Sequence, residues 1–163
     1  MSERLLPGQV VTELNQFYKL ASKIVFDLDG TLDKLIGDQV MAFFGPPFKP
    51  DDHQKRAVQA ALEIVAGVER MAGEVESLHV GGGVGTGPAF MGNVGEGEVR
   101  DFTAIGDTVN TAARLQGEAA SGEVLVMEET YTSVASEFPN APERTLQLKG
   151  KSELVTVRVL RPG

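Results

Sequence analysis

Residues 52–73 constrain the fold most, because they predict a long helix with one apolar face. Charged residues occupy one face of this predicted helix. The apolar residues recur at helical spacing on the opposite face: Val58, Ala61, Leu62, Val65, Val68 and Met71. The rest of the chain supplies shorter apolar segments separated by turns. Glycine makes up 19 of the 163 residues, which fits many tight turns or a backbone lying close to a ligand.

The remaining segments alternate between helical and extended patterns. Further helices are predicted over 9–23 and 128–136, and a third opens at 106–108, runs through Leu115 and closes near Gly117 or Gly122. Strands are predicted over 31–35, 40–44, 78–84, 102–105 and 124–127, with one that begins at 89–91 and ends at Gly92 and Gly95, and two more inside 146–160. Residues 24–26 either extend the first helix or begin a strand. This mixture of crossovers and hairpins predicts one α/β domain, a sandwich of helices on a mixed sheet.

The composition excludes several classes of function. There is no cysteine, so a disulfide, a thiolate metal site and a cysteine nucleophile are impossible. Two histidines leave little room for a histidine metal centre, and a net charge of −8 disfavours general binding to nucleic acid or anionic membranes. No apolar run approaches the ~20 residues of a membrane span, and no signal peptide is visible. We therefore expect a cytoplasmic domain without nucleic-acid or membrane contacts.

Residues 33–38 (DKLIGD) hold the first candidate site residues. A hairpin turn places Asp38 at a sheet edge, where its carboxylate can reach a hard divalent cation such as Mg²⁺. Lys34 lies four residues earlier, on the strand. Taken alone, the segment also fits a solvated turn aspartate and a surface lysine.

Residues 100–114 (RDFTAIGDTVNTAAR) hold the second group. Asp107 or Thr108 can cap a helix, from which Asn110 and Arg114 would project on one face. An amide beside a guanidinium suits a sugar oxygen and a phosphate. The alternative is a capped amphipathic helix with a solvent-facing arginine.

Residues 149–151 (KGK) are the third group, between two predicted strands. Lys149 and Lys151 beside a glycine could meet a triphosphate. The alternative is an ordinary basic turn.

Two further segments are similar to motifs of other protein classes, a phosphate-binding loop and a phosphatase nucleophile motif. The stretch 81–87 (GGGVGTG) lacks both the Gly-Lys-Ser/Thr ending and the strand–helix frame of a phosphate loop, so we interpret it as strand and turn. Residues 26–32 (FDLDGTL) resemble the nucleophile motif of haloacid-dehalogenase-like phosphatases, which would make Asp27 the nucleophile near Asp107. Against this, the residues before Asp27 predict an amphipathic helix rather than a buried strand.

Five segments, in order, resemble the catalytic domain of class III adenylate and guanylate cyclases: SERLLPGQVVTELNQFY, GTLDKLIGDQVMAFFGPP, GVGTGPAFMGNVG, RDFTAIGDTVNTAARLQ and LKGK. The resemblance implies a ferredoxin-like cyclase homology fold over 1–163, with a mixed, mostly antiparallel sheet flanked by helices. It also implies a head-to-tail homodimer with two shared active sites. Each site would convert a nucleoside triphosphate to the 3′,5′-cyclic monophosphate and pyrophosphate, using two Mg²⁺ or Mn²⁺ ions.

The resemblance assigns roles to the first group. Asp38 matches a metal-binding Asp, Lys34 matches the purine-selecting Lys, and Thr103 stands where its partner is found in adenylate cyclases. A lysine donates to adenine N1 and a threonine hydroxyl can accept from the adenine amino group, so the pair is expected to favour ATP. Lys34, Thr103 and Lys149 of one protomer would serve the site that holds Asp38 of the partner subunit.

The resemblance assigns phosphate and sugar contacts to the other groups. Asn110 matches the residue that positions the ribose, and Arg114 matches the Arg that stabilises charge on the transferring phosphate. Lys149 matches a lysine on the triphosphate, and Arg100 is a further candidate for similar work.

One expected feature of the family falls before this chain. Family members begin with a strand bearing a first metal-binding Asp, just upstream of the segment that resembles residues 2–17. The chain starts at Met1, so we expect that strand and that Asp to be absent from it. Either the chain is a fragment, or it is a short form that binds nucleotide or pairs with a complete cyclase. The sequence thus predicts an adenylate cyclase domain, with an inactive interaction module and a phosphatase as alternatives.

Overall fold

The structure, a computed structural model, describes residues 7–47, 49–72, 79–95 and 101–163. Its helices are α1 (Pro7–Asp27), α2 (His53–Ala72), α3 (Asp107–Glu118) and α4 (Glu128–Tyr131). Its strands are β1 (Thr31–Ile36), β2 (Gln39–Phe43), β3 (Gly82–Val84), β4 (Phe90–Val94), β5 (Asp101–Ile105), β6 (Val124–Met127), β7 (Glu143–Leu146) and β8 (Val155–Leu160). Among the described residues no helix combines the length and apolarity needed to cross a membrane.

The strands form one four-stranded sheet and two hairpins. The sheet has the order β3-β6-β8-β7, in which β3 runs parallel to β6 and the other neighbours are antiparallel. The β1–β2 and β4–β5 pairs are antiparallel. The predicted α+β sandwich with mixed, mostly antiparallel pairing is therefore confirmed.

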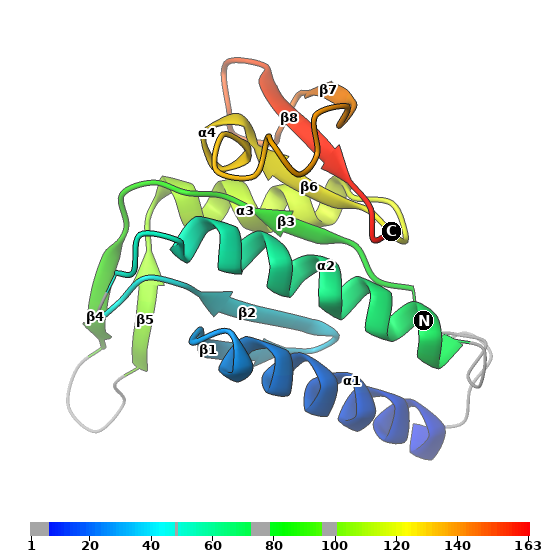
Figure 1. Ribbon diagram of the computed structural model, residues 1–163. Helices are drawn as coiled ribbons and strands as arrows, with labels where there is room; N and C mark the ends of the chain where they lie inside the picture. The colour runs from blue at the N-terminus through cyan, green and yellow to red at the C-terminus, as the bar shows by residue number, and fades with distance from the viewer. Residues whose placement is uncertain (1–6, 48, 73–78, 96–100) are drawn as a thin grey trace.

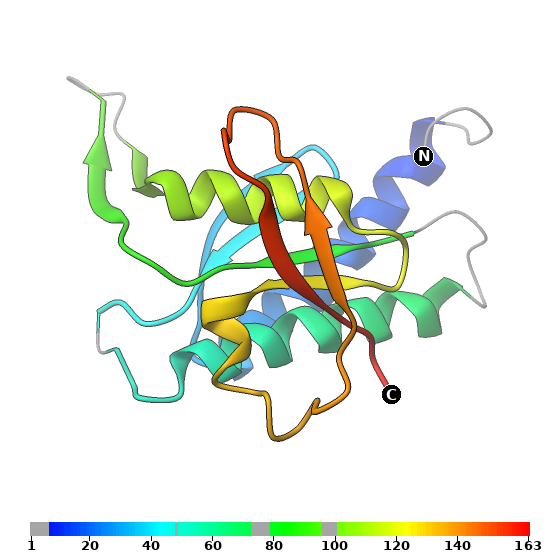
Figure 2. The same cartoon turned by 90° about the horizontal axis from the view of Figure 1, so that it is seen from above.

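The main core lies on both faces of β6, between α2 and α3 (Figures 1 and 2). Val124 and Val126 share a buried cluster with Val58 of α2, whereas Leu125 shares another with Leu115 of α3. Side chains alternate across a strand, so a run of apolar residues fits a strand that is covered on both faces. This sandwich fixes the position of α3.

Helix α1 packs beside α2 and supports the β1–β2 hairpin (Figure 1). Phe17 and Ala21 of α1 form a small cluster with Val68 of α2. The hairpin turns at Gly37, whose φ of +60° suits glycine at the first position of a two-residue turn. The turn thus places Asp38 at the tip of the hairpin, as expected.

The β4–β5 pair projects away from the rest of the fold as an arm (Figures 1 and 2). Its large apolar side chains are exposed: Phe90, Val94, Phe102 and Ile105. Phe90, Val94 and Ile105 share one face of the pair and Phe102 lies on the other, so the arm is a candidate interaction surface.

Several element boundaries differ from the sequence predictions. Residues 24–26 continue α1, which settles the alternative left open for them. Strand β2 is half-buried rather than buried. The first C-terminal strand was expected after residue 146, but β7 ends at Leu146 and pairs it with Val155. Strand β7 is an edge strand with alternately exposed polar residues, so it gives a weak apolar signal.

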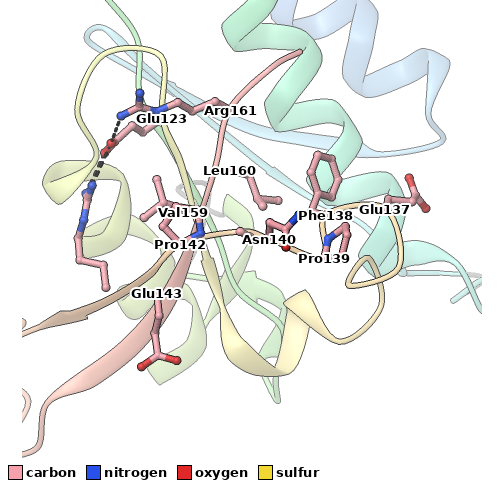
Figure 3. Close-up of a pocket in the computed structure, with 12 residues that line it drawn as sticks. Glu123, Glu137, Phe138, Pro139, Asn140, Pro142, Glu143, Val159, Leu160 and Arg161 are labelled. Atoms are coloured by element: carbon pink, nitrogen blue, oxygen red, sulfur yellow. Dashed lines mark hydrogen bonds and ion pairs between the residues drawn. The ribbon is translucent and has the colours of Figure 1, made fainter.

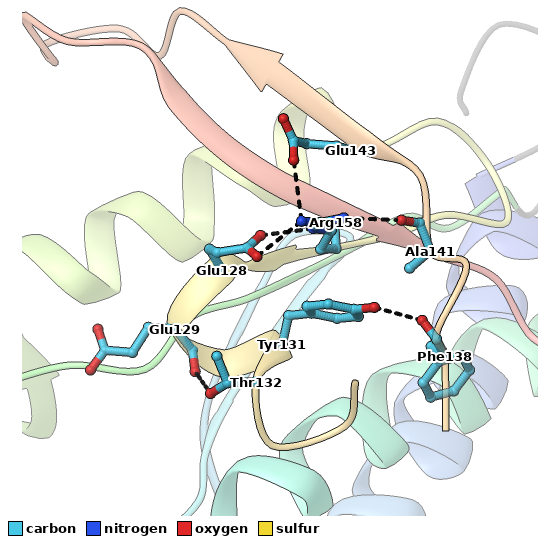
Figure 4. Close-up of polar contacts among 8 residues, drawn as sticks. All are labelled: Glu128, Glu129, Tyr131, Thr132, Phe138, Ala141, Glu143 and Arg158. Carbon is cyan, nitrogen blue, oxygen red and sulfur yellow. Dashed lines mark hydrogen bonds and ion pairs between the residues drawn. The ribbon is translucent and has the colours of Figure 1, made fainter. Parts of the chain in front are cut away.

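Helix α4 is much shorter than the predicted 128–136, because residues 132–137 continue as turns in which the N–H groups of Ser133, Val134 and Glu137 donate to carbonyl oxygens three residues back. Side-chain contacts also hold this segment (Figure 4). The Tyr131 hydroxyl donates to the Phe138 carbonyl oxygen at 2.6 Å. Arg158 of β8 donates to both carboxylate oxygens of Glu128, at 2.8 and 3.1 Å, and lies over the Tyr131 ring. These contacts fix the segment that follows β6 onto the sheet.

Candidate active site

The two residues expected to read the purine meet at a third residue, Asp33. Thr103 of β5 donates its hydroxyl proton to Asp33 Oδ2 at 2.8 Å, although the two lie 70 positions apart. The Lys34 ammonium lies 3.5 Å from Asp33 Oδ1. The Asp33 side chain is 0% exposed, Thr103 is 7% exposed and the Lys34 side chain is 29% exposed. Lys34 and Thr103 are therefore brought together at a buried carboxylate.

A β-bulge in β1 makes this arrangement possible. Leu32 pairs with Ala42 but Lys34 pairs with Met41, so Asp33 is the extra residue of the bulge. In regular pairing, neighbouring residues point to opposite faces of a sheet. The bulge re-aims side chains, so that Asp33 and Lys34 contact each other while Asp33 also reaches β5. Sequence reasoning missed Asp33 because no residue in this segment signals a bulge.

The predicted ribose and phosphate residues lie on α3. Asn110 is exposed and Arg114 is half-buried, while Thr111 and Leu115 face inward. The spacing of four residues places Asn110 and Arg114 on one helix face, as expected. The expected side-chain cap is wrong: α3 begins after Gly106 without one, and the Thr108 hydroxyl donates to the Pro88 carbonyl instead.

The 149–151 turn is tied to α3 at two places. The Arg114 guanidinium lies against Gly150, so close that a Cβ there would come within 3.3 Å of Nη2. Lys151 pairs with Asp107 in the first turn of α3. Lys151 is therefore committed to the fold, whereas Lys149 is exposed. Arg114 therefore lies beside the turn that carries Lys149.

Asp38 lies at the tip of the β1–β2 hairpin and is exposed. Its neighbour Gln39 donates to Gln116 of α3 at 2.8 Å, and Tyr18 donates to the Gly37 carbonyl. A carboxylate in this position fits one ligand of a divalent cation. Among the described residues, no three His, Cys, Asp or Glu side chains gather in a way that could hold a metal ion. These residues of a single chain therefore do not complete a two-metal site.

Arg100 lies outside the described residues, so its predicted contact with the triphosphate stays a prediction.

The glycine-rich stretch 81–87 serves packing, as the strand interpretation predicts. A Cβ on Gly83 would come within 2.3 Å of the Ala112 carbonyl oxygen of α3. This position therefore needs glycine for the close approach of β3 to α3. The residues after Val84 continue to β4 rather than into a helix, so no phosphate loop forms.

The phosphatase hypothesis is wrong. Asp27 is the last residue of helix α1 rather than a residue at the end of a strand, and it pairs with Lys23 of the same helix. Asp107 pairs with Lys151. The two aspartates therefore have separate partners and, in the part of the chain that the structure describes, no strand precedes Asp27 to present it as a nucleophile.

A cavity of about 640 Å³ lies away from all of these residues (Figure 3). It is lined by segment 137–144, by the end of β8 and by Glu123, a side chain that is 2% exposed. Arg144 donates to both Glu123 carboxylate oxygens, at 2.8 and 2.9 Å, and Arg161 donates to one at 2.7 Å. These hydrogen bonds, those from Arg144 above all, lower the pKa of Glu123 from 4.5 to about 2. This network stabilises the fold and holds none of the predicted site residues.

Comparison with known proteins identifies the class of protein. The family described as adenylate and guanylate cyclase catalytic domain matches residues 1–161. The chain therefore belongs to the cyclase catalytic domain family. This result confirms the resemblance and supports nucleotidyl cyclase activity and the use of divalent metals as general properties of the family.

The relatives include both adenylate and guanylate cyclases. Adenylate cyclase 1 of Rhizobium meliloti (strain 1021) is 34% identical over 122 residues, which are 72% of this chain and 18% of that protein. The adenylyl cyclase CyaB from P. aeruginosa superimposes with a TM-score of 0.81 at 28% identity, covering 99% of this chain and 87% of CyaB. The guanylyl cyclase Cya2 gives a TM-score of 0.82 at 25% identity, covering 99% and 85%. Similarity alone therefore does not choose between ATP and GTP.

Proposed function

We propose that this chain is an adenylate cyclase domain that converts ATP to 3′,5′-cyclic AMP and pyrophosphate at a site shared by two copies. The main support for this proposal is that Lys34 and Thr103 both contact the Asp33 carboxylate. The Lys34 ammonium donates to adenine N1, and the Thr103 hydroxyl accepts from the adenine amino group. Guanine presents an N–H and a carbonyl oxygen at the same atoms, so this pair opposes GTP.

The surface formed by α3 and the 149–151 turn would bind the rest of the nucleotide. Asn110 orients the ribose, and Arg114 with Lys149 binds the phosphates. In the reaction, the 3′-oxygen bonds to the α-phosphorus, the bond to pyrophosphate breaks and the 3′-hydroxyl proton is released. Arg114 would stabilise the charge that builds on the phosphate oxygens in the transition state.

A second copy of the chain would complete the site. The exposed apolar side chains of the β4–β5 arm support such an interface: Phe90, Val94, Phe102 and Ile105. In the head-to-tail arrangement, Lys34 and Thr103 of one protomer face Asp38 of the partner subunit. We expect this homodimer to act in the cytoplasm.

Asp38 would supply one ligand to the Mg²⁺ or Mn²⁺ ions. Such ions neutralise phosphate charge and lower the pKa of the attacking hydroxyl. The two-metal site would need carboxylates beyond Asp38.

Cyclic AMP formation tests the proposal directly. The chain as printed, and any in-frame extension encoded before Met1, is incubated with ATP and Mn²⁺, and the products are separated by chromatography. We expect cyclic AMP and pyrophosphate, with ATP preferred over GTP. Asp38→Asn should lower turnover at least a hundredfold, because a neutral amide binds divalent cations poorly. Asp51→Asn changes an exposed aspartate far from the hairpin tip and is the matched control.

A catalytically inactive nucleotide-binding subunit is the second candidate function. The observation that favours it is that no three His, Cys, Asp or Glu side chains gather into a metal site among the described residues. It predicts ATP binding without product, together with association with a complete class III cyclase and a change in that enzyme's rate. Cyclic AMP formation by the purified chain would exclude this candidate.

A further inference from the structure

The Thr103 hydroxyl needs its proton fixed if it is to discriminate between purines. A hydroxyl carries one donor and two acceptor positions, and it rotates to suit its partner. A freely rotating Thr103 would accept from the adenine amino group or donate to the guanine carbonyl oxygen. Selectivity therefore depends on where that single proton goes.

Asp33 holds that proton. An ionised carboxylate can only accept hydrogen bonds, so the 2.8 Å contact between Thr103 Oγ1 and Asp33 Oδ2 requires the threonine to donate. The Asp33 side chain is 0% exposed, so water does not compete for this contact from bulk solvent. Thr103 then has only acceptor positions left for any other partner.

The same carboxylate lies beside the second purine-reading group. The Lys34 ammonium is 3.5 Å from Asp33 Oδ1, the oxygen that Thr103 does not use. A lysine ammonium is a hydrogen-bond donor without acceptor capacity. The buried Asp33 carboxylate thus contacts both purine-reading groups. Toward a purine, Lys34 can only donate a hydrogen bond and Thr103 can only accept one.

We propose that Asp33 is the positioning residue that sets purine selectivity, because it takes the proton of Thr103 and leaves that side chain an obligate acceptor beside the Lys34 donor. This inference rests on the proposed function and deepens it. Asp33 itself touches no atom of the base and acts through Thr103 and Lys34. The β-bulge in β1 orients the Asp33 side chain so that it reaches Thr103 and Lys34.

Asp33→Asn tests the inference because it keeps the size of the side chain and adds a donor. The new amide can donate to Thr103 Oγ1, which frees the hydroxyl proton for the guanine carbonyl. We expect the ratio of kcat/KM for ATP to that for GTP to fall at least tenfold, mainly through KM. Asp33→Ala, which removes the acceptor without adding a donor, should move the ratio in the same direction. Asp27→Asn changes an exposed aspartate at the end of α1 and should leave the ratio unchanged.

A double-mutant cycle separates positioning from a general structural role. In a Thr103→Val background no hydroxyl remains to be oriented, so Asp33→Asn should change the ratio much less than in the wild type. An unchanged ratio in Asp33→Asn, or an equal loss with both nucleotides, would overturn the inference. Loss of cooperative thermal unfolding in both Asp33 variants would assign this residue to the fold and would also overturn it.

Binding measurements keep the inference distinct from the proposed function. Fluorescence titration with N-methylanthraniloyl derivatives of ATP and GTP gives the ratio of Kd values whether or not the chain turns over. If the wild type forms cyclic AMP and the Asp33 variants keep its selectivity, the inference fails and the function stands. If the wild type neither binds ATP nor converts it, both are overturned.

Discussion

The four-stranded sheet and the β1–β2 hairpin are both built from short apolar strands, yet they differ sharply in burial. In β6, Val124, Leu125 and Val126 are 0% exposed, since α2 and α3 cover both faces of this sheet. In β1, Leu35 is 46% exposed and Ile36 is 52% exposed. The sheet therefore carries much of the stability, while the hairpin presents candidate site residues at a surface that a nucleotide can reach.

Glu123 of the sheet region and Asp33 of the hairpin both carry buried carboxylates, but the partners of the two differ. Glu123 is satisfied by Arg144, Arg161 and a backbone N–H, and its contacts only join parts of the fold. Asp33 is satisfied by Thr103 and Lys34, two groups that can each bind a further partner. The difference lies in which residues each carboxylate contacts: Asp33 contacts two predicted site residues, and Glu123 contacts none.

The largest expected effect is on the sheet. Leu125→Ala should lower the free energy of unfolding by about 2–5 kcal/mol, because it leaves a cavity in a fully packed core. Leu35→Ala in the hairpin should cost less than about 0.5 kcal/mol, since that side chain is half in solvent. Urea denaturation measures both. Equal losses would contradict the assignment of stability to the sheet.

Arg114→Ala should show the opposite pattern. We expect kcat/KM for ATP to fall about 10²–10³-fold, or about 2.7–4 kcal/mol, with little change in unfolding, because in the proposed function the guanidinium stabilises charge in the transition state. Arg70→Ala removes an exposed arginine of α2 and is the control. A variant that loses stability but not activity would place Arg114 with the scaffold.

Acid should weaken the scaffold through Glu123. Its pKa is about 2 in the folded chain against an ordinary 4.5, so the carboxylate stabilises the fold fully above about pH 4.5. That contribution, about 3 kcal/mol, is lost as the pH falls through 2. Glu123→Gln should remove it, so the difference in unfolding free energy between wild type and variant should shrink over this range. A constant difference between pH 5 and pH 2 would show that Glu123 is not held in this way.

A smaller effect than that of the sheet, Arg114 or Glu123 variants is expected of Tyr131→Phe (Figure 4). Loss of the 2.6 Å hydrogen bond to the Phe138 carbonyl should cost about 1 kcal/mol of unfolding free energy. Activity should stay unchanged, because the bond lies in the scaffold. Thermal unfolding and the cyclic AMP assay measure the two quantities, and a selective loss of activity would link this region to the site.

Much of the fold follows from local patterns. The helices α1, α2 and α3 and the β1–β2 hairpin are predicted because their periodicity and turn glycines are strong. Strand β7 and the end of α4 are not, because an edge strand has few apolar residues and the chain passes from α4 into tighter turns without a breaking residue. The same local patterns predict the placement of Asp38 at a turn and of Asn110 with Arg114 on one helix face.

The sequence by itself determined which residues carry charge and hydrogen-bonding groups, and it determined their spacing along each helix and strand. Only the tertiary structure decided that Asp33 lies between Lys34 and Thr103, and that Arg114 lies against the turn holding Lys149. These contacts join segments far apart in the chain. They depend on a bulge and on the packing of β3 against α3, which no local pattern encodes.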